Sequence, residues 1–323
     1  MHNPGGLGKA MAGDSKLFRK FIAIDQRIKS ANFNEILSDD FFKEVDRFAA
    51  DAAAHYRAIG VDALIVPNDI VFFEQLNIKI LEKLEKPSFV FLHGLPSRYN
   101  RYDENQADYL IVWGKKIKQN YVNAGVDPEK IIVSGHPFYE KLSSGPLRYG
   151  LDDILIISKS LNGSQQRDGV RLIDRGNLII YLEGVKNVLK SIGVKNVRLR
   201  VHPSESIDWY FKFIDRDFFI ADSSPLQDSL RRATLVIGPT STVFLESIYY
   251  GVNYLVYEPT SQNIDLSGFP LVPPFDGSDP KVAVAKNEAE LRQLLKGKTV
   301  LDKTVFNDYI ETPFNPRVFT DLI

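Results

Sequence analysis

Residues 234–259, TLVIGPTSTVFLESIYYGVNYLVYEP, contain one complete repeat of an α/β fold. An apolar run ends at Ile237, Gly238 and Pro239 turn the chain, and a helical pattern follows. A second apolar run begins at Tyr254. Near-continuous apolar strands separated by helices are typical of buried parallel strands. Right-handed crossovers between such strands build doubly wound sheets.

The same alternation runs through most of the chain. It predicts strands at residues 62–67, 88–94, 108–114, 130–135, 154–160, 196–203, 218–222, 234–239 and 254–259. Helical patterns lie between them, most clearly at residues 72–85, 177–193 and 241–251. Prolines and glycines interrupt the alternation at residues 136–150, which we interpret as a linker.

The chain therefore divides into two units, and its 323 residues suit two domains of about 150 residues each. We predict an α/β protein of two Rossmann-like, doubly wound domains that face a cleft. The predicted domains are residues 1–145 and 146–315, with a closing segment at 316–323 that crosses back to the first domain. The glycine-rich stretch at 3–10 looks like the turn after a first strand, yet no strand precedes it. An irregular start, preceding residues absent from this chain and a flexible terminus are three explanations that stay open.

Composition excludes several classes of protein. A formal net charge of -1 provides no basic field for a nucleic acid backbone, so we expect no nucleic acid partner. The chain has no cysteine, which rules out disulfides, thiol catalysis and cysteine-bound metals. No apolar run approaches the roughly 20 residues that span a bilayer, and the N-terminus is no signal peptide. We expect a soluble, cytoplasmic protein, with peripheral association at the cytoplasmic face of the membrane as an open alternative.

The turn at Gly238, Thr240, Ser241 and Thr242 is the most informative candidate site. Ligands of open α/β sheets bind beyond the carboxyl ends of the strands. A helix start there offers backbone N–H groups, hydroxyls and a positive dipole end, which suit a phosphate. Glu246, one turn later, could accept both hydroxyls of a ribose. The alternative is plain helix capping, with Glu246 as a surface charge.

A second candidate is the strand end LRVHPSES at residues 199–206. Pro203 fixes the chain where the strand ends, which leaves His202 at its tip, and Arg200 lies two residues earlier. His202 could hydrogen-bond a phosphate and stabilise a departing nucleotide. The alternative is a half-buried histidine bonded to backbone.

The polar loop at residues 158–169, SKSLNGSQQRDG, follows the first strand of the second unit. Its first residues, Ser158, Lys159 and Ser160, are candidate ligands of the same phosphate. A solvated loop without a ligand explains the stretch equally well.

The first unit offers two candidate bases. His93 lies at the root of a long excursion, residues 91–109, and loops of this length are often functional. Asp69 ends the neighbouring strand and opens a helix, where capping is the simpler role.

Other chemistries find no support. The sequence has no GxSxG elbow, no GxxxxGK[ST] phosphate loop and no HExxH zinc pair. Histidines and acids do not cluster at the spacing of metal ligands. We therefore expect no metal and no cofactor.

The order of these motifs resembles the GT-B glycosyltransferases. The second unit is similar to the donor domain of enzymes with cytidine-activated donors, namely bacterial sialyltransferases, Kdo transferases and teichoic-acid glycerophosphotransferases. The likeness rests on the His-Pro pair at 202–203, SLRRA at 229–233, GPTST at 238–242, ExxxxG at 246–251 and YLVYEP at 254–259. In the first unit, HG at 93–94, ADYLIVWG at 107–114 and KIIVSGHP at 130–137 are also similar.

The resemblance implies how these residues act. In those families a His-Pro motif and a pair of Ser or Thr residues hold the donor phosphate, which carries over to His202 and to the turn at 240–242. His93 matches the HG position of the glycerophosphotransferases and is the implied base. The Asp/Glu-Gly motif of the sialyltransferases has no match in the first unit.

The expected reaction moves a sugar from a nucleotide donor to an acceptor hydroxyl. A CMP-linked ulosonic acid such as sialic acid or Kdo is the favoured donor. The expected acceptor is a bacterial surface glycan or its lipid-linked precursor, with other polysaccharide-assembly proteins as further partners. His93 or Asp69 would take the acceptor proton, while His202 and the turn would stabilise the leaving phosphate.

Three alternatives stay open. One is a CDP-glycerol glycerophosphotransferase or another transferase that uses a UDP-sugar. Another is a non-hydrolysing UDP-sugar epimerase, which needs a denser set of acids and histidines. The last is a non-catalytic subunit that binds a nucleotide sugar.

Overall fold

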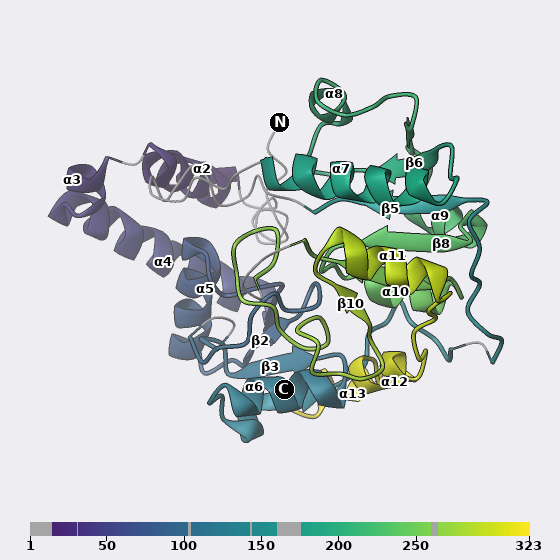
Figure 1. Cartoon of the computed structure of the whole chain (residues 1–323). Helices are drawn as coiled ribbons and strands as arrows, with labels where there is room; N and C mark the ends of the chain where they lie inside the picture. The colour runs from purple at the N-terminus through teal and green to yellow at the C-terminus, as the bar shows by residue number, and fades with distance from the viewer. Residues whose placement is uncertain (1–14, 31, 103–104, 143, 160–175, 260–263) are drawn as a thin grey trace.

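The computed structural model describes residues 15–30, 32–102, 105–142, 144–159, 176–259 and 264–323 (Figure 1). Within them, the chain forms two parallel sheets. The first sheet has the order β1-β2-β3-β4, and its strands are β1 (Leu64–Val66), β2 (Ser88–Phe91), β3 (Tyr109–Val112) and β4 (Ile131–Val133).

The second sheet has the order β10-β9-β8-β5-β6-β7. Its strands are β5 (Ile154–Ile157), β6 (Val197–Arg200), β7 (Phe219–Ala221), β8 (Leu235–Gly238), β9 (Tyr254–Tyr257) and β10 (Val284–Ala285). The order reverses between β5 and β8, which pair in parallel with Leu155 opposite Val236. Such a reversal leaves a crevice at the carboxyl ends of the two strands, where ligands of this fold class bind.

Both sheets agree with the predicted α/β fold of two Rossmann-like units. All nine predicted strands are present, and β10 is a further strand that the sequence analysis missed. The domain limits at residues 145 and 315 stay predictions.

Helices connect the strands. They are α5 (Phe72–Lys83), α6 (Lys115–Asn123), α7 (Gly176–Ser191), α8 (Ile207–Tyr210), α9 (Leu226–Arg232), α10 (Val243–Tyr249), α11 (Glu288–Lys296), α12 (Val305–Tyr309) and α13 (Arg317–Thr320), with a 3-10 turn at Pro128–Lys130. Helices α7 and α11 pack against each other, and α12 packs on both α6 and α10. The chain after the second sheet therefore returns to the first.

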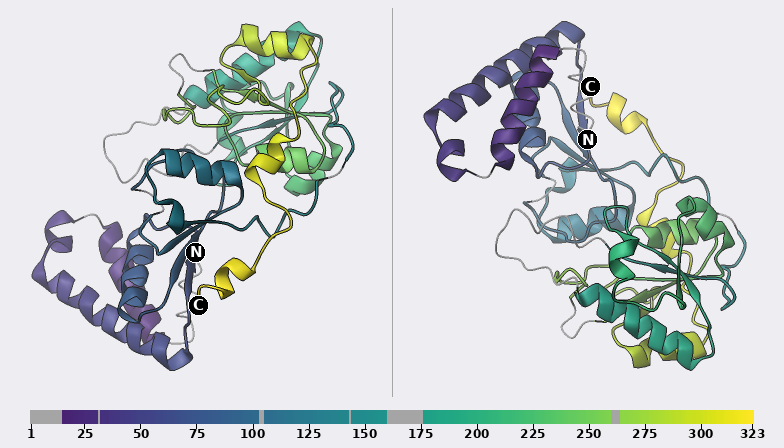
Figure 2. Two further views of the ribbon diagram at one scale, coloured as in Figure 1. Left: turned by 90° about the horizontal axis from the view of Figure 1, so that it is seen from below. Right: turned by 90° about the horizontal axis from the view of Figure 1, so that it is seen from above.

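A helical extension precedes the first sheet and was not predicted. It comprises α2 (Ser15–Lys29), α3 (Phe33–Ile36) and α4 (Asp39–Ile59), and it projects from the body of the molecule (Figures 1 and 2). Helix α4 begins at Ser38, whose hydroxyl accepts a hydrogen bond from Phe41 N at 3.2 Å, and ends at Gly60 in the left-handed conformation. A separate apolar core joins α2, α4 and α5 around Phe21, Phe48 and Phe73.

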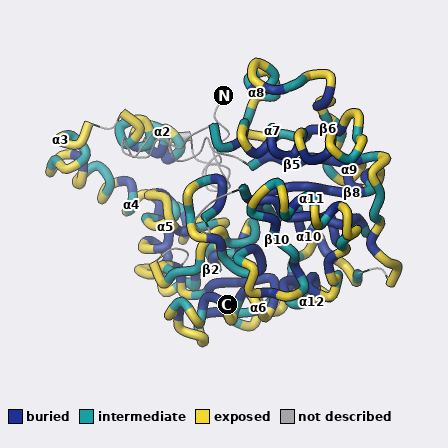
Figure 3. Tube along the Cα trace, in the orientation of Figure 1, coloured by how far each residue is buried: buried dark blue, intermediate teal, exposed yellow. Residues whose placement is uncertain are grey.

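One apolar core spans both sheets. It includes Val90 and Trp113 from the first sheet and Val236 and Phe244 from the second, and Phe306 of α12 is part of it. A second core fills the other side of the second sheet, under α7 and α11. Buried backbone is continuous through β5 and β8 in Figure 3, while the extension is largely exposed. The two sheets are thus packed together by side chains, in addition to their connection through the chain.

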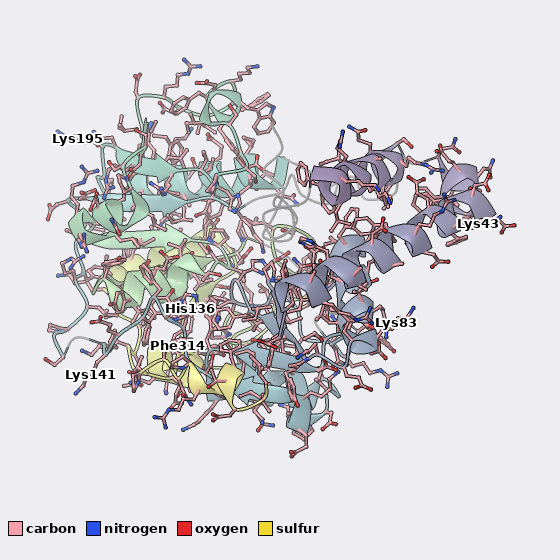
Figure 4. All side chains as sticks on the ribbon, turned by 180° about the vertical axis from the view of Figure 1, so that it is seen from behind. Lys43, Lys83, His136, Lys141, Lys195 and Phe314 are labelled. Atoms are coloured by element: carbon pink, nitrogen blue, oxygen red, sulfur yellow. The ribbon has the colours of Figure 1, made fainter. Side chains whose placement is uncertain are left out.

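The C-terminal segment crosses back to the first sheet (Figure 2). Glu311 N donates to Trp113 O at 2.7 Å, and Asn315 N donates to Ser134 O at 2.7 Å. Phe319 of α13 packs on Phe89 and Phe91, with ring centroids 5.5 and 6.1 Å apart. Figure 4 shows Phe314 of this segment close to His136, which follows β4.

Arg148 anchors the segment that joins the two sheets. Its guanidinium donates to the carbonyls of Leu230, Ala233 and Tyr250 at 2.8, 3.2 and 3.1 Å. These carbonyls lie at the C-terminal ends of α9 and α10, where the last turn of a helix leaves its carbonyls without partners. One arginine therefore caps two helices and fixes the connecting chain to them.

Candidate functional site

A cavity of about 240 Å³ lies at the carboxyl end of the second sheet. Residues from three strand ends of this sheet line it: Ser158 and Lys159 after β5, His202 after β6, and Thr240, Ser241 and Thr242 after β8. Leu95 and Ser97 contribute from the first sheet's loop, and Phe275 contributes from the segment between β9 and β10. Six of the predicted donor-binding residues thus converge on one cavity at the crevice of the doubly wound sheet.

Lys159 supplies the cation of the cavity. Its ammonium is paired with the carboxylate of Asp265, and the side chains are 15% and 3% exposed. Asp265 also accepts backbone N–H bonds from Ser267 and Phe269 at 2.8 and 3.0 Å. A lysine held in this way presents a fixed positive charge, which is what a phosphate requires.

His202 is held by its neighbours. Its backbone N–H donates to Ser158 Oγ at 2.9 Å, and Ser204 N donates to its ring Nδ1 at 3.2 Å. An accepting Nδ1 places the proton of the neutral ring on Nε2. Partial burial lowers the pKa of His202, although Glu205 acts in the opposite direction. At neutral pH the ring is therefore a neutral N–H donor.

A buried carboxylate that the sequence analysis missed supports the turn at 240–242. Glu258 follows β9 and is 0% exposed. Its Oε1 accepts from Thr240 N and Thr240 Oγ1 at 2.6 and 2.5 Å, and its Oε2 accepts from Leu266 N at 2.9 Å. Burial raises the pKa of Glu258, and the nearby Lys159 ammonium partly offsets this. The last residue of YLVYEP but one therefore fixes the turn, and its position at a strand end was the available signal.

The other two hydroxyls of the turn have different partners. Ser241 Oγ accepts from Val243 N at 3.2 Å, a local contact at the start of α10. Thr242 Oγ1 accepts from Leu95 N at 2.9 Å, across to the first sheet's loop. Since α10 has only seven residues, we assign the anion-binding capacity of the site to Lys159, His202 and the hydroxyls.

The loop after β2 forms the first-sheet side of the cavity. Besides Leu95 and Ser97, it carries Arg98, whose guanidinium lies 5.8 Å from the ring centroid of Phe269. This loop thus contacts the second unit at both the turn and the segment that holds Lys159.

His93 lies at the root of this loop, two residues before Leu95, and is exposed. Its Nδ1 is 3.0 Å from Pro67 O, the carbonyl that follows β1. A carbonyl only accepts, so Nδ1 carries the proton and Nε2 of the neutral ring holds a lone pair. This is the tautomer that a general base needs.

Asp69 has a different environment. Its side chain is 1% exposed and accepts N–H bonds from Gln106 and Ala107, where the long loop returns to β3. It does not cap α5, whose first residue is preceded by Val71. Because the carboxylate holds the loop from a buried position, we do not carry Asp69 forward as a base.

The remaining predicted ligands do not line the cavity. Arg200 donates to Ser224 O and lies 3.7 Å from a carboxylate oxygen of Asp222. Glu246 is half-buried, and burial raises its pKa while Arg200 lowers it. Pro203 is exposed. Ser160 lies outside the described residues, as does the glycine-rich stretch at 3–10.

Gly238 has a packing role. A Cβ built on this residue would meet Tyr254 Oη at 2.1 Å, and that hydroxyl donates to Pro239 O at 2.6 Å. The absent side chain lets a buried tyrosine brace the start of the turn.

His136, which the sequence places at a strand end, belongs to an aromatic cluster. Its ring lies 4.6 Å from Trp113 and 5.6 Å from Phe91, and its Nδ1 accepts from Phe138 N at 3.1 Å. Burial lowers its pKa. It is a core histidine.

Two further searches bear on the site. Among the described residues, no group of three or more His, Cys, Asp or Glu side chains is placed to hold a metal ion. Within the same residues, no helix combines the length and the apolar character that crossing a bilayer requires.

Comparison with known proteins gives a fold. No protein-family model matches the chain, and no curated protein matches its sequence. A UDP-GlcNAc 2-epimerase from Methanocaldococcus jannaschii, in complex with UDP-GlcNAc and UDP, aligns with a TM-score of 0.54 at 14% identity, over 86% of this chain and 80% of that one. The Neisseria meningitidis UDP-GlcNAc 2-epimerase bound to UDP-GlcNAc gives 0.52 at 12% identity, over 86% and 80%. The S. aureus MnaA–UDP co-structure gives 0.51 at 11% identity, over 86% and 80%.

Identities this low establish the fold and leave activity open. These structures share the GT-B-like arrangement of two Rossmann-like units that the sequence predicted, and the fold is confirmed. The finer resemblance to enzymes with cytidine-activated donors is not among the findings. The chain has a two-unit α/β fold of the GT-B type.

Proposed function

We propose that this protein binds a UDP-sugar in the cavity at the second sheet and transfers the sugar to an acceptor hydroxyl. One observation carries the proposal: a cation, a histidine N–H and a run of hydroxyls converge at the crevice of a doubly wound sheet. Such a set matches the charge and the acceptor oxygens of a diphosphate. UDP replaces CMP as the favoured nucleotide because the aligned structures named above are complexes with UDP or UDP-GlcNAc.

The reaction follows from the two histidines. The acceptor oxygen attacks the anomeric carbon, the bond from that carbon to the phosphate oxygen breaks, and UDP leaves. His93 Nε2 takes the proton of the acceptor hydroxyl. Lys159 and the Nε2–H of His202 stabilise the charge that develops on the leaving diphosphate, which is where electrostatic catalysis is most effective.

Epimerisation is the second candidate, favoured by the aligned structures, which are titled UDP-GlcNAc 2-epimerases. Inversion at a carbon requires removal and return of a C–H proton, and the described lining of the cavity includes one histidine and no carboxylate. Transfer to a hydroxyl needs one base and fits this lining better. Incubation of UDP-GlcNAc without acceptor separates the two, because an epimerase inverts the sugar under these conditions and a transferase does not.

Nucleotide binding is the direct test. We expect UDP to raise the melting temperature by a few degrees at about 100 times its dissociation constant, which adds roughly 2.7 kcal/mol to the folded state. CMP, CDP and GDP should have smaller effects. Selective stabilisation by CMP would restore the ulosonic-acid donor, and CDP would indicate a glycerophosphate donor. No stabilisation by any nucleotide would overturn the proposal.

A matched pair of variants locates the bound nucleotide. His202→Asn keeps an acceptor for Ser204 N–H and removes the Nε2–H donor. Hydrogen bonds to charged groups contribute about 1.5–3 kcal/mol, so we expect the Kd for UDP to rise about ten- to hundredfold. Lys195→Ala removes an exposed cation before β6, well away from the crevice (Figure 4). Titration calorimetry should show the loss only for the histidine variant, and equal affinities would exclude His202 from the site.

A further inference from the structure

Thr242 connects the donor cavity to the first sheet's loop. Its Oγ1 accepts from Leu95 N at 2.9 Å, although the two residues are 147 positions apart in the chain. The contact is close, because a Cβ built on Gly94 would lie 2.9 Å from the same oxygen. The glycine of the HG pair is therefore required for the approach of this hydroxyl to the loop.

Residues 92–95 are anchored at three points. Leu92 N donates to Ile111 O of β3 at 3.2 Å. His93 Nδ1 bonds Pro67 O at 3.0 Å, and Leu95 N bonds Thr242. Two of these anchors belong to the first sheet, and the third belongs to the turn that lines the donor cavity.

We propose that Thr242 is a positioning residue that sets the place of the base His93 relative to the donor, through its bond to Leu95 N. The inference rests on the proposed function and replaces the expectation that Thr242 is mainly a phosphate ligand. Within the turn, Thr240 donates to Glu258, and Thr242 accepts from the loop. Ser241, whose only protein contact described above is local, is the hydroxyl that remains for a phosphate.

Thr242→Val tests this role because valine has the shape of threonine and lacks the accepting oxygen. We expect UDP affinity within about twofold of the unsubstituted protein. UDP release from UDP-GlcNAc should fall about ten- to hundredfold, since a misplacement of about 1 Å costs this much. Thr242→Ser should restore the rate. Ser241→Ala, in the same cavity, should weaken UDP binding.

A double-mutant cycle identifies the route of the effect. If Thr242 acts through His93, Thr242→Val costs nothing further in a His93→Ala background. Additive losses would overturn the proposal, as would a tenfold loss of UDP affinity in Thr242→Val alone. Gly94→Ala approaches the same contact from the loop and should repeat the loss of rate.

Histidine-selective NMR gives a readout that does not depend on turnover. The chain has five histidines, and the His93 ring signals can be assigned with His93→Ala. Thr242→Val and Gly94→Ala should shift these signals, whereas Ser241→Ala should leave them in place. Unchanged His93 signals in both variants would reject the positioning role. If the unsubstituted protein binds no UDP, the proposed function fails, and the NMR comparison still decides whether Thr242 positions His93.

Discussion

Glu258 is the residue on which the geometry of the donor turn depends most directly. Three donors converge on its two oxygens, and none of them contacts water, because the side chain is 0% exposed. Glu258→Gln replaces one oxygen by an NH₂ group that faces an N–H donor. We expect a loss of about 1–3 kcal/mol in the free energy of unfolding, as for a buried group left without a partner.

Urea unfolding checks this expectation. Glu82→Gln, an exposed carboxylate on α5, is the control and should change the free energy of unfolding by less than about 0.5 kcal/mol. Equal stability of the two variants would show that the buried network tolerates an amide.

His136 gives the molecule a dependence on acid. Burial lowers the pKa of His136 below its ordinary value of 6.5. As pH falls below 6.5, the unfolded chain takes up a proton that the folded chain refuses, so stability present above pH 6.5 is lost towards the lowered pKa. His136→Asn keeps an acceptor for Phe138 N–H and removes the titration. Unfolding measured at pH 7.5 and 5.5 should show a smaller difference for this variant, and an identical difference would assign the effect to other groups.

Single residues of the site were the part that the sequence predicted unevenly. His202 and the hydroxyls of the turn could be found because a strand end and a helix start are recognisable from apolar periodicity. Glu258 and Asp265 could not be assigned, since their partners are backbone N–H groups and a lysine brought near only by the fold. Asp69 was misleading for the same reason: a polar residue after a strand has the same sequence pattern whether it binds a ligand or a loop.

At the scale of elements, the C-terminal segment depends on a glycine at the end of β4. Gly135 has φ +77, and a Cβ there would meet Glu311 O at 2.3 Å. Gly60 has φ +68 and no atom within 4 Å of its Cβ position. Alanine at either site incurs the left-handed backbone strain of about 1–2 kcal/mol, but only Gly135→Ala also displaces the returning chain.

Thermal melting separates these two costs. We expect Gly60→Ala to lower the melting temperature by roughly 2–4 °C and Gly135→Ala to lower it by at least twice as much. If the two variants melt together, the C-terminal segment adds nothing to stability at this contact.

Elements were predicted where their pattern was long and apolar. The strands on both sheets stood out as short apolar runs, and α5 and α7 as periodic segments. Strand β10, two residues long, is too short to leave a pattern. The extension of α2 and α4 was missed although its buried residues, such as Phe41, Phe48 and Ala52, recur at helical spacing. Attention to strand–helix alternation hid a segment that has helices alone.

At the scale of the whole molecule, the shared core predicts cooperative unfolding. Phe306 of α12 is 0% exposed and lies 5.5 Å from Tyr139, which follows the first sheet, and 6.1 Å from Tyr249 of α10. Because both units bury side chains in this one core, we expect a single calorimetric transition. Phe306→Ala should lower the free energy of unfolding by about 3–5 kcal/mol and keep the transition single. Two resolved transitions would show that the units unfold independently.

The shared core also explains what the sequence could not reveal about the site. A pattern of strands and helices indicates two units and the edge at which each binds ligands. It does not tell which loop of one unit contacts which turn of the other. The bond between Leu95 and Thr242 depends on the packing of the units, which no local periodicity encodes.

The return of Phe319 to the first sheet has a consequence during synthesis. Phe319 leaves the ribosome about 230 residues after Phe91, the strand residue that it covers. At a translation rate of about 5–20 residues per second, roughly 10–50 s pass between the two events. During this interval Phe89 and Phe91 lack their final cover, so the nascent chain displays an aromatic surface to chaperones until the cover arrives.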